Sequence, residues 1–156
     1  VIIIYSCGRF NLCETKGGKT VVLSNKRMEL PGSGHEERLD VMAAIQAHVQ
    51  WKLRLQAYID GSEEEFDPEV VGSDCLCSLG RWIHGHGEER YGDHPRFLLM
   101  KQIHADFHTY AAEVVKAVQR GEQENARNLL LKGEYARVSN RIKSVLAGLS
   151  LEFDFS

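Results

Sequence analysis

Apolar residues between positions 35 and 61 recur at helical spacing. Residues three and four apart share one face of an α-helix, so a row at these intervals marks the buried side. One such row has intervals of four, three, four and three: Ala44, His48, Trp51, Leu55, Tyr58. A second row lies beside it: Met42, Ile45, Val49, Leu53. The pattern predicts a long helix with a wide apolar face, ended by Gly61 and followed by an acidic, solvated connection up to Pro68.

A short helix is predicted around Cys77. Ser73 or Asp74 is a suitable N-cap, and the apolar residues that follow run through Cys77 to Ile83. The segment His84–Gly87 contains two glycines and is expected to end this helix, with a polar loop after it.

A long helix is predicted to start at Asp93 or His94, because Pro95 is tolerated only in a first turn. Gly121 is expected to end it. Its buried stripe comprises Phe97, Met100, His104, Phe107, His108, Ala111, Val115 and Val118.

The last part of the chain carries an apolar seam at alternating spacings of four and three: Leu131, Tyr135, Val138, Ile142, Val145, Leu149. Such a seam is typical of antiparallel bundle or coiled-coil-like packing. Gly133 interrupts it and predicts a kink or a close helix crossing, since glycine costs about 1 kcal/mol relative to alanine inside a helix. The fold class predicted by these patterns is all-α, a small helical bundle.

Residues 1–34 differ from the rest. Val1–Tyr5 and Thr20–Leu23 are rich in β-formers and flank a glycine pair, which predicts a β-hairpin or the tail of an upstream β-containing domain. The breaker cluster Leu30–Gly34 marks a boundary. We therefore expect an N-terminal extension over 1–34, a helical domain over 35–150 and a tail over 151–156. The start at Val1 is what a fragment of a longer protein would show.

The composition and the net charge argue against some classes of function. The 156 residues are 43% hydrophobic and 26% charged, which is ordinary for a globular domain. The net charge of −3, without a basic cluster, gives no footprint for nucleic acid or an anionic membrane. No apolar run approaches a membrane span or a signal peptide, so a cytoplasmic location is expected.

The four cysteines are Cys7, Cys13, Cys75 and Cys77. A chain of this size does not need disulfide staples, and Cys75 and Cys77 are too close in sequence to join distant elements. Reduced cysteines with a metal or redox role are therefore favoured over two disulfides.

Three histidines and one cysteine form a candidate metal centre. His104 and His108 lie one helical turn apart on one face, and His48 and Cys77 arrive from two other predicted helices. A single histidine on an apolar stripe is usually a hydrogen-bonded core residue. Burying three imidazoles and a thiol together without an ion would cost several kcal/mol in unsatisfied polar groups. The combination therefore predicts a tetrahedral Zn²⁺ site.

Cys77 is the favoured sulfur ligand. In the first turn of its helix, the helix dipole and free N–H groups favour the thiolate. Cys75 is the competing candidate. Asp74 is a candidate for orienting the site, although a plain N-cap is the simpler role, and Trp51 and Trp82 are expected to wall the site and exclude water.

A catalytic role is disfavoured. Four protein ligands saturate a tetrahedral zinc and leave no position for water. The helical metalloprotease motif also needs Glu directly after its first His, where this chain has Ala105. Two alternatives remain open: a His-only zinc hydrolase, and a structural zinc-stapled module that dimerises through the C-terminal seam.

The arrangement of these residues resembles the chemoreceptor zinc-binding (CZB) family over roughly residues 37–149. The resemblance is carried by three motifs: His48 with Trp51, Cys77-x-Leu79-Gly80-x-Trp82, and His104-x-x-x-His108. Residues 1–34 match nothing in the family.

The resemblance implies a four-helix bundle, commonly a homodimer, with one zinc per protomer bound by His48, Cys77, His104 and His108. It also implies control of a linked bacterial signalling domain, in a chemoreceptor or a diguanylate cyclase that makes cyclic-di-GMP. The stimulus in such domains is zinc or an oxidant such as hypochlorous acid. No output domain is present in the chain, so the output stays open.

Overall fold

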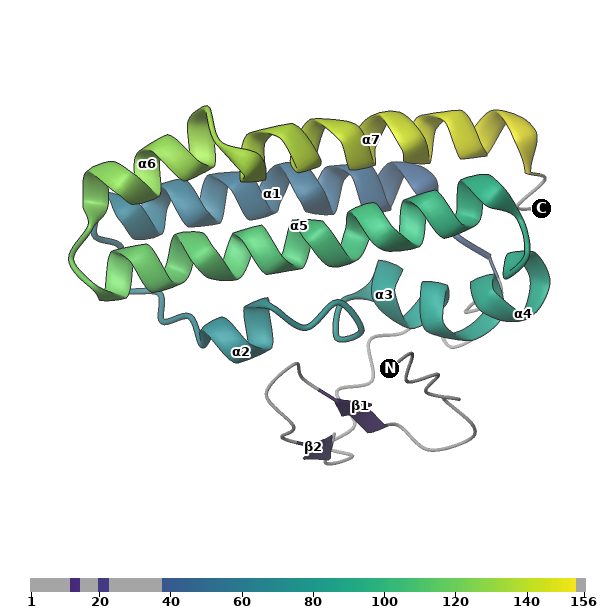
Figure 1. The fold of residues 1–156 in the computed structure, drawn as a ribbon, viewed down its shortest axis with the longest axis horizontal. Coiled ribbons are helices and arrows are strands. Elements are labelled where there is room, and N and C mark those ends of the chain that lie inside the picture. The colour runs from purple at the N-terminus through teal and green to yellow at the C-terminus, as the bar shows by residue number, and fades with distance from the viewer. Residues whose placement is uncertain (1–11, 15–19, 23–37, 154–156) are drawn as a thin grey trace, which may run out of the picture.

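The computed structural model describes residues 12–14, 20–22 and 38–153. Three long rods of helix run side by side (Figure 1): α1 (Val41–Ile59), α5 (Pro95–Gln119), and the pair α6 (Gln123–Leu131) and α7 (Glu134–Glu152). The fourth side is a series of short elements: α2 (Pro68–Val71), α3 (Ser78–Trp82), the π-helical turn η1 (Ile83–Gly87) and α4 (Glu88–Tyr91). From residue 38 to residue 153 the described elements are all helical, as the sequence predicted.

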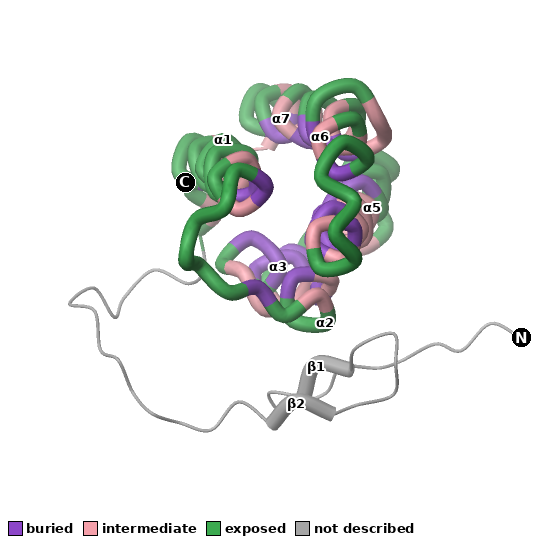
Figure 2. Tube along the Cα trace, turned by 90° about the vertical axis from the view of Figure 1, so that its left-hand side faces the viewer, coloured by how far each residue is buried: buried purple, intermediate pink, exposed green. Residues whose placement is uncertain are grey.

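Viewed end-on, the four sides surround one core, and the buried parts of each helix face inward (Figure 2). The side chains with under 2% exposure and the largest volume come from five of these elements: Leu55, Ile83, Phe97, Met100, Phe107, Leu130, Tyr135, Ile142, Leu146. The fourth side differs from a regular bundle because short helices take the place of one continuous helix.

The signals in the sequence set the ends of α1 and α5. The Asp40 side chain caps α1 by accepting a hydrogen bond from the Ala43 N–H at 2.8 Å. The His94 side chain caps α5, and Pro95 occupies its first turn. Gly61 (φ 94°) and Gly121 (φ 77°) follow the two helices in the left-handed conformation that glycine tolerates. Both helices were predicted.

The segment before Cys77 contains a helix that the pattern did not predict. Asp67 caps α2 by accepting from the Glu69 N–H at 2.8 Å, and Pro68 is its first residue. The sequence reading treated Pro68 as the end of a solvated connection. It instead starts a single helical turn whose Val71 is buried against α5.

The short helix ends within His84–Gly87, as predicted, because Gly85 leaves the helical conformation, but the polar loop predicted after it is wrong, since α4 follows. The backbone changes direction at Gly85 (φ −117°, ψ −111°) and then continues through η1 into α4. Gly87 is needed for packing at this point, because a Cβ there would lie 2.8 Å from ring atoms of both Trp82 and Phe97. These glycines allow the break at Gly85 and the close contact at Gly87 between two helical segments.

Gly133 produces the predicted interruption and separates α6 from α7. A Cβ on Gly133 would lie 2.9 Å from the Leu129 Cα, so the chain passes very close to the preceding turn. Within the seam, Tyr135, Ile142 and Leu149 are buried in the core of the same chain. The seam therefore packs inside the protomer.

In the N-terminal extension, β1 (Leu12–Glu14) pairs with β2 (Thr20–Val22) in antiparallel register, with Cys13 opposite Val21. The predicted strand at Val1–Tyr5 lies outside the described residues. The extent of the extension and the boundary near residue 34 stay predictions. Across the described ranges, no helix combines the length and the apolar character that crossing a bilayer requires.

Replacing Gly80 by Ala should destabilise α3. A Cβ at this position would lie 1.8 Å from the backbone oxygen of Asp74, so α3 and the Asp74 turn cannot keep their present packing. We expect a loss of about 1–3 kcal/mol in the free energy of unfolding, measured by chemical denaturation. Gly85→Ala is the matched control, because nothing lies within 4 Å of its Cβ position. Equal stability of the two variants would contradict the close contact at Gly80.

Candidate metal centre

One thiol and two imidazoles meet where α3 packs beside α5. The ligand atoms of Cys77, His104 and His108 all lie within 4.8 Å of one another. The closest pair is Cys77 Sγ and His104 Nε2, at 3.3 Å. His104 is fully buried and His108 nearly so. The cluster therefore has the size and the donor atoms of a metal site.

Cys77 is itself the N-cap of α3, which corrects the assignment of that role to Ser73 or Asp74. Its backbone is extended (φ −79°, ψ 165°), and its Sγ accepts a hydrogen bond from the Gly80 N–H at 3.2 Å. Burial raises the pKa of the Cys77 thiol, while the Gly80 and Leu79 N–H groups act in the opposite direction. Without a metal the thiol is therefore protonated near neutral pH, and binding as thiolate releases that proton.

Two backbone carbonyls orient the histidines. His108 Nδ1 donates to the Val71 oxygen at 2.7 Å, and His48 Nδ1 donates to the Ala44 oxygen at 2.6 Å. With Nδ1 carrying the proton, Nε2 keeps the lone pair in both rings. This is the usual arrangement around metal-ligating histidines. No side-chain pattern indicates this role of Val71, because its carbonyl reaches His108 only through the packing of α2 on α5.

His48 lies beside the cluster but is not among the three residues whose ligand atoms converge. Its ring centroid is 5.9 Å from that of His104 and 4.6 Å from that of Phe107. Its side chain is buried in the same core. The structure thus gathers Cys77, His104 and His108 and places His48 next to them.

Burial lowers the pKa values of His48, His104 and His108, and that of His104 is also lowered by the charge of His108. All three rings are therefore neutral at pH 7 and offer lone pairs. Among the described residues, His104 Nδ1 is buried without a hydrogen-bond partner. A buried group of neutral imidazoles around a thiol is costly by itself and well suited to a cation.

Asp74 lies on the edge of the cluster and contacts His84. Its Oδ2 is 3.0 Å from His84 Nε2. Burial acts to raise the pKa of Asp74, but the His84 contact outweighs it and the pKa is lowered, so the carboxylate is ionised. The sequence did not identify this His84 contact, because a separation of ten residues follows no helical or strand period.

Cys75 is disulfide-bonded, and its Sγ lies 3.4 Å from Ser73 Oγ. The expectation of reduced cysteines is wrong for this residue. A sulfur in a disulfide is not available as a thiolate, so Cys77 is the sulfur that the geometry favours as a ligand.

Trp51 lies on the histidine side of the site. Its ring lies edge-on to His108 with centroids 6.4 Å apart, and it packs against Phe66. The Arg54 guanidinium lies 4.6 Å above the Trp51 ring and is held by Glu64. Trp82 packs at the opposite end of α3, against Tyr91 and Phe97. Only Trp51 is therefore placed as a wall beside a candidate ligand.

The donor set indicates the metal. Thiolate sulfur and imidazole nitrogen are ligands that zinc prefers, whereas magnesium and calcium prefer oxygen. The residues present therefore fit Zn²⁺, which would be held by Cys77 with His104 and His108 and would supply a closed cross-link between α3 and α5.

Comparison with known proteins agrees with this geometry. Residues 48–115 match the family model described as the chemoreceptor zinc-binding domain. The matched range begins at His48 and includes all four predicted ligands. Neither the curated proteins nor the solved structures contain a match to the chain. This match over the ligand-bearing helices, together with the Cys77, His104 and His108 cluster, identifies zinc as the cofactor, and residues 48–115 are similar to a chemoreceptor zinc-binding domain.

Proposed function

We propose that the helical domain is a zinc-binding regulatory module that holds one Zn²⁺ per protomer and modulates a linked bacterial signalling output. The buried cluster of Cys77, His104 and His108 within 4.8 Å carries this proposal. The output is chemotaxis or cyclic-di-GMP signalling, the location is cytoplasmic, and the stimulus is zinc or an oxidant.

His48 is the fourth ligand in this proposal. Its Nε2 keeps a lone pair because Nδ1 is bonded to the Ala44 carbonyl, and its ring lies beside that of His104. Three histidines and one cysteine then fill a tetrahedral site.

A regulatory role fits the site better than catalysis. With four protein ligands there is no open position for a reacting water. Ala105 offers no general base, and Asp106 is engaged by Gln102 at 2.9 Å. We therefore assign no catalytic residue. The alternative of a His-only zinc hydrolase is disfavoured by the 3.3 Å approach of the Cys77 sulfur to His104.

The regulated element in this proposal is α3. It is five residues long, and Cys77 at its first end is its one proposed ligand. Two ligands on α5 lie within a helix of 25 residues and have little freedom to move. Zinc withdrawal or oxidation of Cys77 to sulfenic acid would release the first end of α3 and alter the packing of the fourth side.

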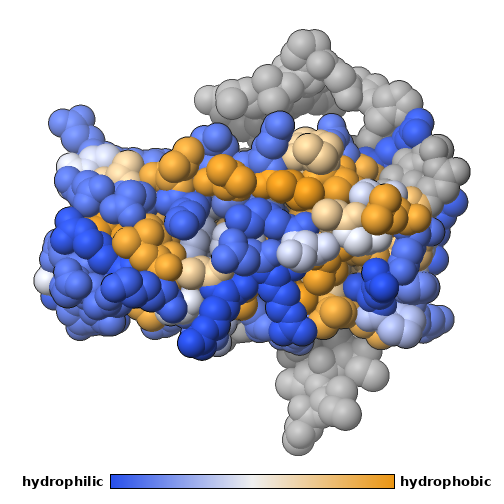
Figure 3. All heavy atoms as spheres, turned by 90° about the horizontal axis from the view of Figure 1, so that it is seen from above, coloured by the Kyte–Doolittle hydropathy of each residue, from blue (hydrophilic) through white to orange (hydrophobic). Residues whose placement is uncertain are grey.

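The exposed face of α1 supports a homodimer. Met42, Val49 and Leu53 are 64%, 42% and 57% exposed and follow one another at spacings of seven and four. The apolar band runs along the α1 side of the molecule when it is seen from above (Figure 3). The charged residues of α1 are Lys52 and Arg54, and Arg54 is paired with Glu64. A helix face poor in charge suits the two-fold pairing of identical helices.

Zinc content tests the ligand assignment. We expect about one zinc per chain in the wild type, measured by metal analysis of the purified protein. Cys77→Ser and His104→Ala should weaken zinc binding by more than about a hundredfold, since even residues that only orient ligands are worth 10–100-fold. His86→Ala is the matched control and should bind like the wild type. Unchanged stoichiometry and affinity in both ligand variants would refute the site.

Zinc removal distinguishes a sensor from a structural staple, which is a zinc site that only holds the helices together. We expect a chelator, or stoichiometric hypochlorous acid, to release zinc while most of the helical circular dichroism is kept. The physical reason is that the core of α1, α5 and α7 remains packed when α3 is freed. Cys77→Ser is the control and should lose its response to the oxidant. Complete unfolding, or no release of zinc, would instead support the staple.

The dimer is tested by a charge on α1. Leu53→Glu should convert a wild-type dimer to a monomer in sedimentation or light-scattering measurements, because a carboxylate pair would be buried at the two-fold interface. Leu131→Glu is the matched control, being 48% exposed on α6. A monomeric wild type at about 100 μM, well above a micromolar dissociation constant, or a dimer that tolerates Leu53→Glu, would overturn this interface.

A further inference from the structure

A group of aromatic rings joins the last turn of α7 to the segment that begins at Cys77. The Phe153 ring lies 4.4 Å from that of Tyr91 and 4.7 Å from that of His94. Tyr91 in turn lies 6.2 Å from Trp82, and Trp82 lies 6.0 Å from Phe97. We call Trp82, Tyr91, Phe97 and Phe153 the aromatic joint. The joint belongs to three different parts of the chain, α3 with α4, α5 and the end of α7.

The aromatic joint is connected to Cys77 through α3. Trp82 is the last residue of α3, and Cys77 is the N-cap of the same helix. A helix of five residues moves as one body, so a shift at Cys77 moves Trp82. Packing around Trp82 leaves little slack, since a Cβ at Gly87 would lie 2.8 Å from both the Trp82 and the Phe97 ring.

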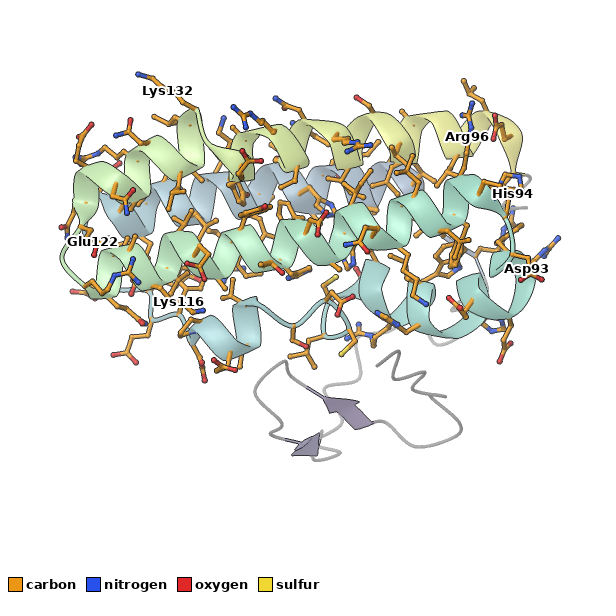
Figure 4. The ribbon with its side chains drawn as sticks, in the orientation of Figure 1. Asp93, His94, Arg96, Lys116, Glu122 and Lys132 are labelled. Atoms are coloured by element: carbon orange, nitrogen blue, oxygen red, sulfur yellow. The ribbon has the colours of Figure 1, made fainter. Side chains whose placement is uncertain are left out.

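Polar contacts hold the same end of α7 in position. Arg96 Nη1 pairs with Glu152 Oε1 at 3.0 Å, and a Cβ at Gly148 would lie 3.3 Å from the same Arg96 nitrogen. His94 and Arg96 both lie at the end of the bundle where α7 finishes (Figure 4). An exposed ion pair contributes little free energy, and this one links the end of α7 to the start of α5.

We propose that the aromatic joint couples zinc occupancy at Cys77 to the packing of the last turn of α7, with Phe153 as the positioning residue. The zinc part of this proposal rests on the proposed function. Coupling between two sites is reciprocal, so a change at Phe153 must be felt at Cys77 as strongly as the reverse. Loss of the Phe153 ring would loosen α3 and α4, and zinc binding would then have to restore their order.

The test uses the full chain with Phe153→Ala and measures two quantities. The first is zinc affinity, by competition with a chromophoric chelator, where we expect at least about fivefold weaker binding. The second is amide hydrogen exchange of residues 78–91 in the metal-free chain, which should become faster than in the wild type. In the wild type, zinc removal should also speed exchange in the last turn of α7.

Two controls exclude a general loss of stability. Leu151→Ala changes an 89% exposed side chain in the same turn, and Leu130→Val trims a buried side chain of α6. Neither should change zinc affinity or exchange in residues 78–91. Equal zinc affinity in Phe153→Ala and the wild type, or an equal loss in Leu130→Val, would overturn the coupling. If the wild type binds no zinc, the proposed function fails. Amide hydrogen exchange of residues 78–91 in the metal-free variants then tests, by itself, whether the aromatic joint orders α3 and α4.

Discussion

The burial of three neutral imidazole rings and one thiol is the constraint on which this domain depends. Their charged forms are disfavoured inside the helical core, and burial lowers the pKa of each histidine. Backbone carbonyls accept a hydrogen bond from Nδ1 of His48 and from Nδ1 of His108. The second nitrogen of each ring keeps its lone pair and has no such partner among the described residues. A bound cation resolves this arrangement because each lone pair becomes a ligand and the thiol loses its proton. The core is therefore built for a metal, and its apolar packing fixes where the ligands lie.

The broken fourth side of the bundle follows from the position of Cys77. A cysteine inside a continuous helix would present its side chain from a rigid backbone, whereas an N-cap residue holds its sulfur beside free N–H groups. The Gly80 N–H contact and the close approach of Gly80 to Asp74 fix the start of α3 without a long helix. The fourth side thus presents a precisely placed ligand on a short helix that is packed into the core through Leu79 and Trp82.

Much of the fold could be predicted from the sequence because α1 and α5 carry strong local signals. Asp40, Pro95, Gly61 and Gly121 mark their ends, and the spacing of His104 and His108 is itself helical. Cys77 as N-cap, the helix α4 after the break at Gly85 and the single turn of α2 could not be predicted, since their conformations depend on contacts with Asp74, Trp82 and α5. The Val71 carbonyl that orients His108 belongs to a backbone atom and leaves no pattern in side-chain types.

In the proposed zinc site, the distribution of the four proposed ligands over the helices determines which bond could act as a switch. Both α5 ligands lie in the interior of a long helix, and detaching either would require the core to open. His48 lies in the middle of α1 and is fixed in the same way. Cys77 differs because its helix is short, its side chain is partly exposed, and sulfur is the donor that oxidants attack. The donor most sensitive to oxidants thus lies at the start of the shortest helix that carries a proposed ligand, whereas the histidines lie inside long helices.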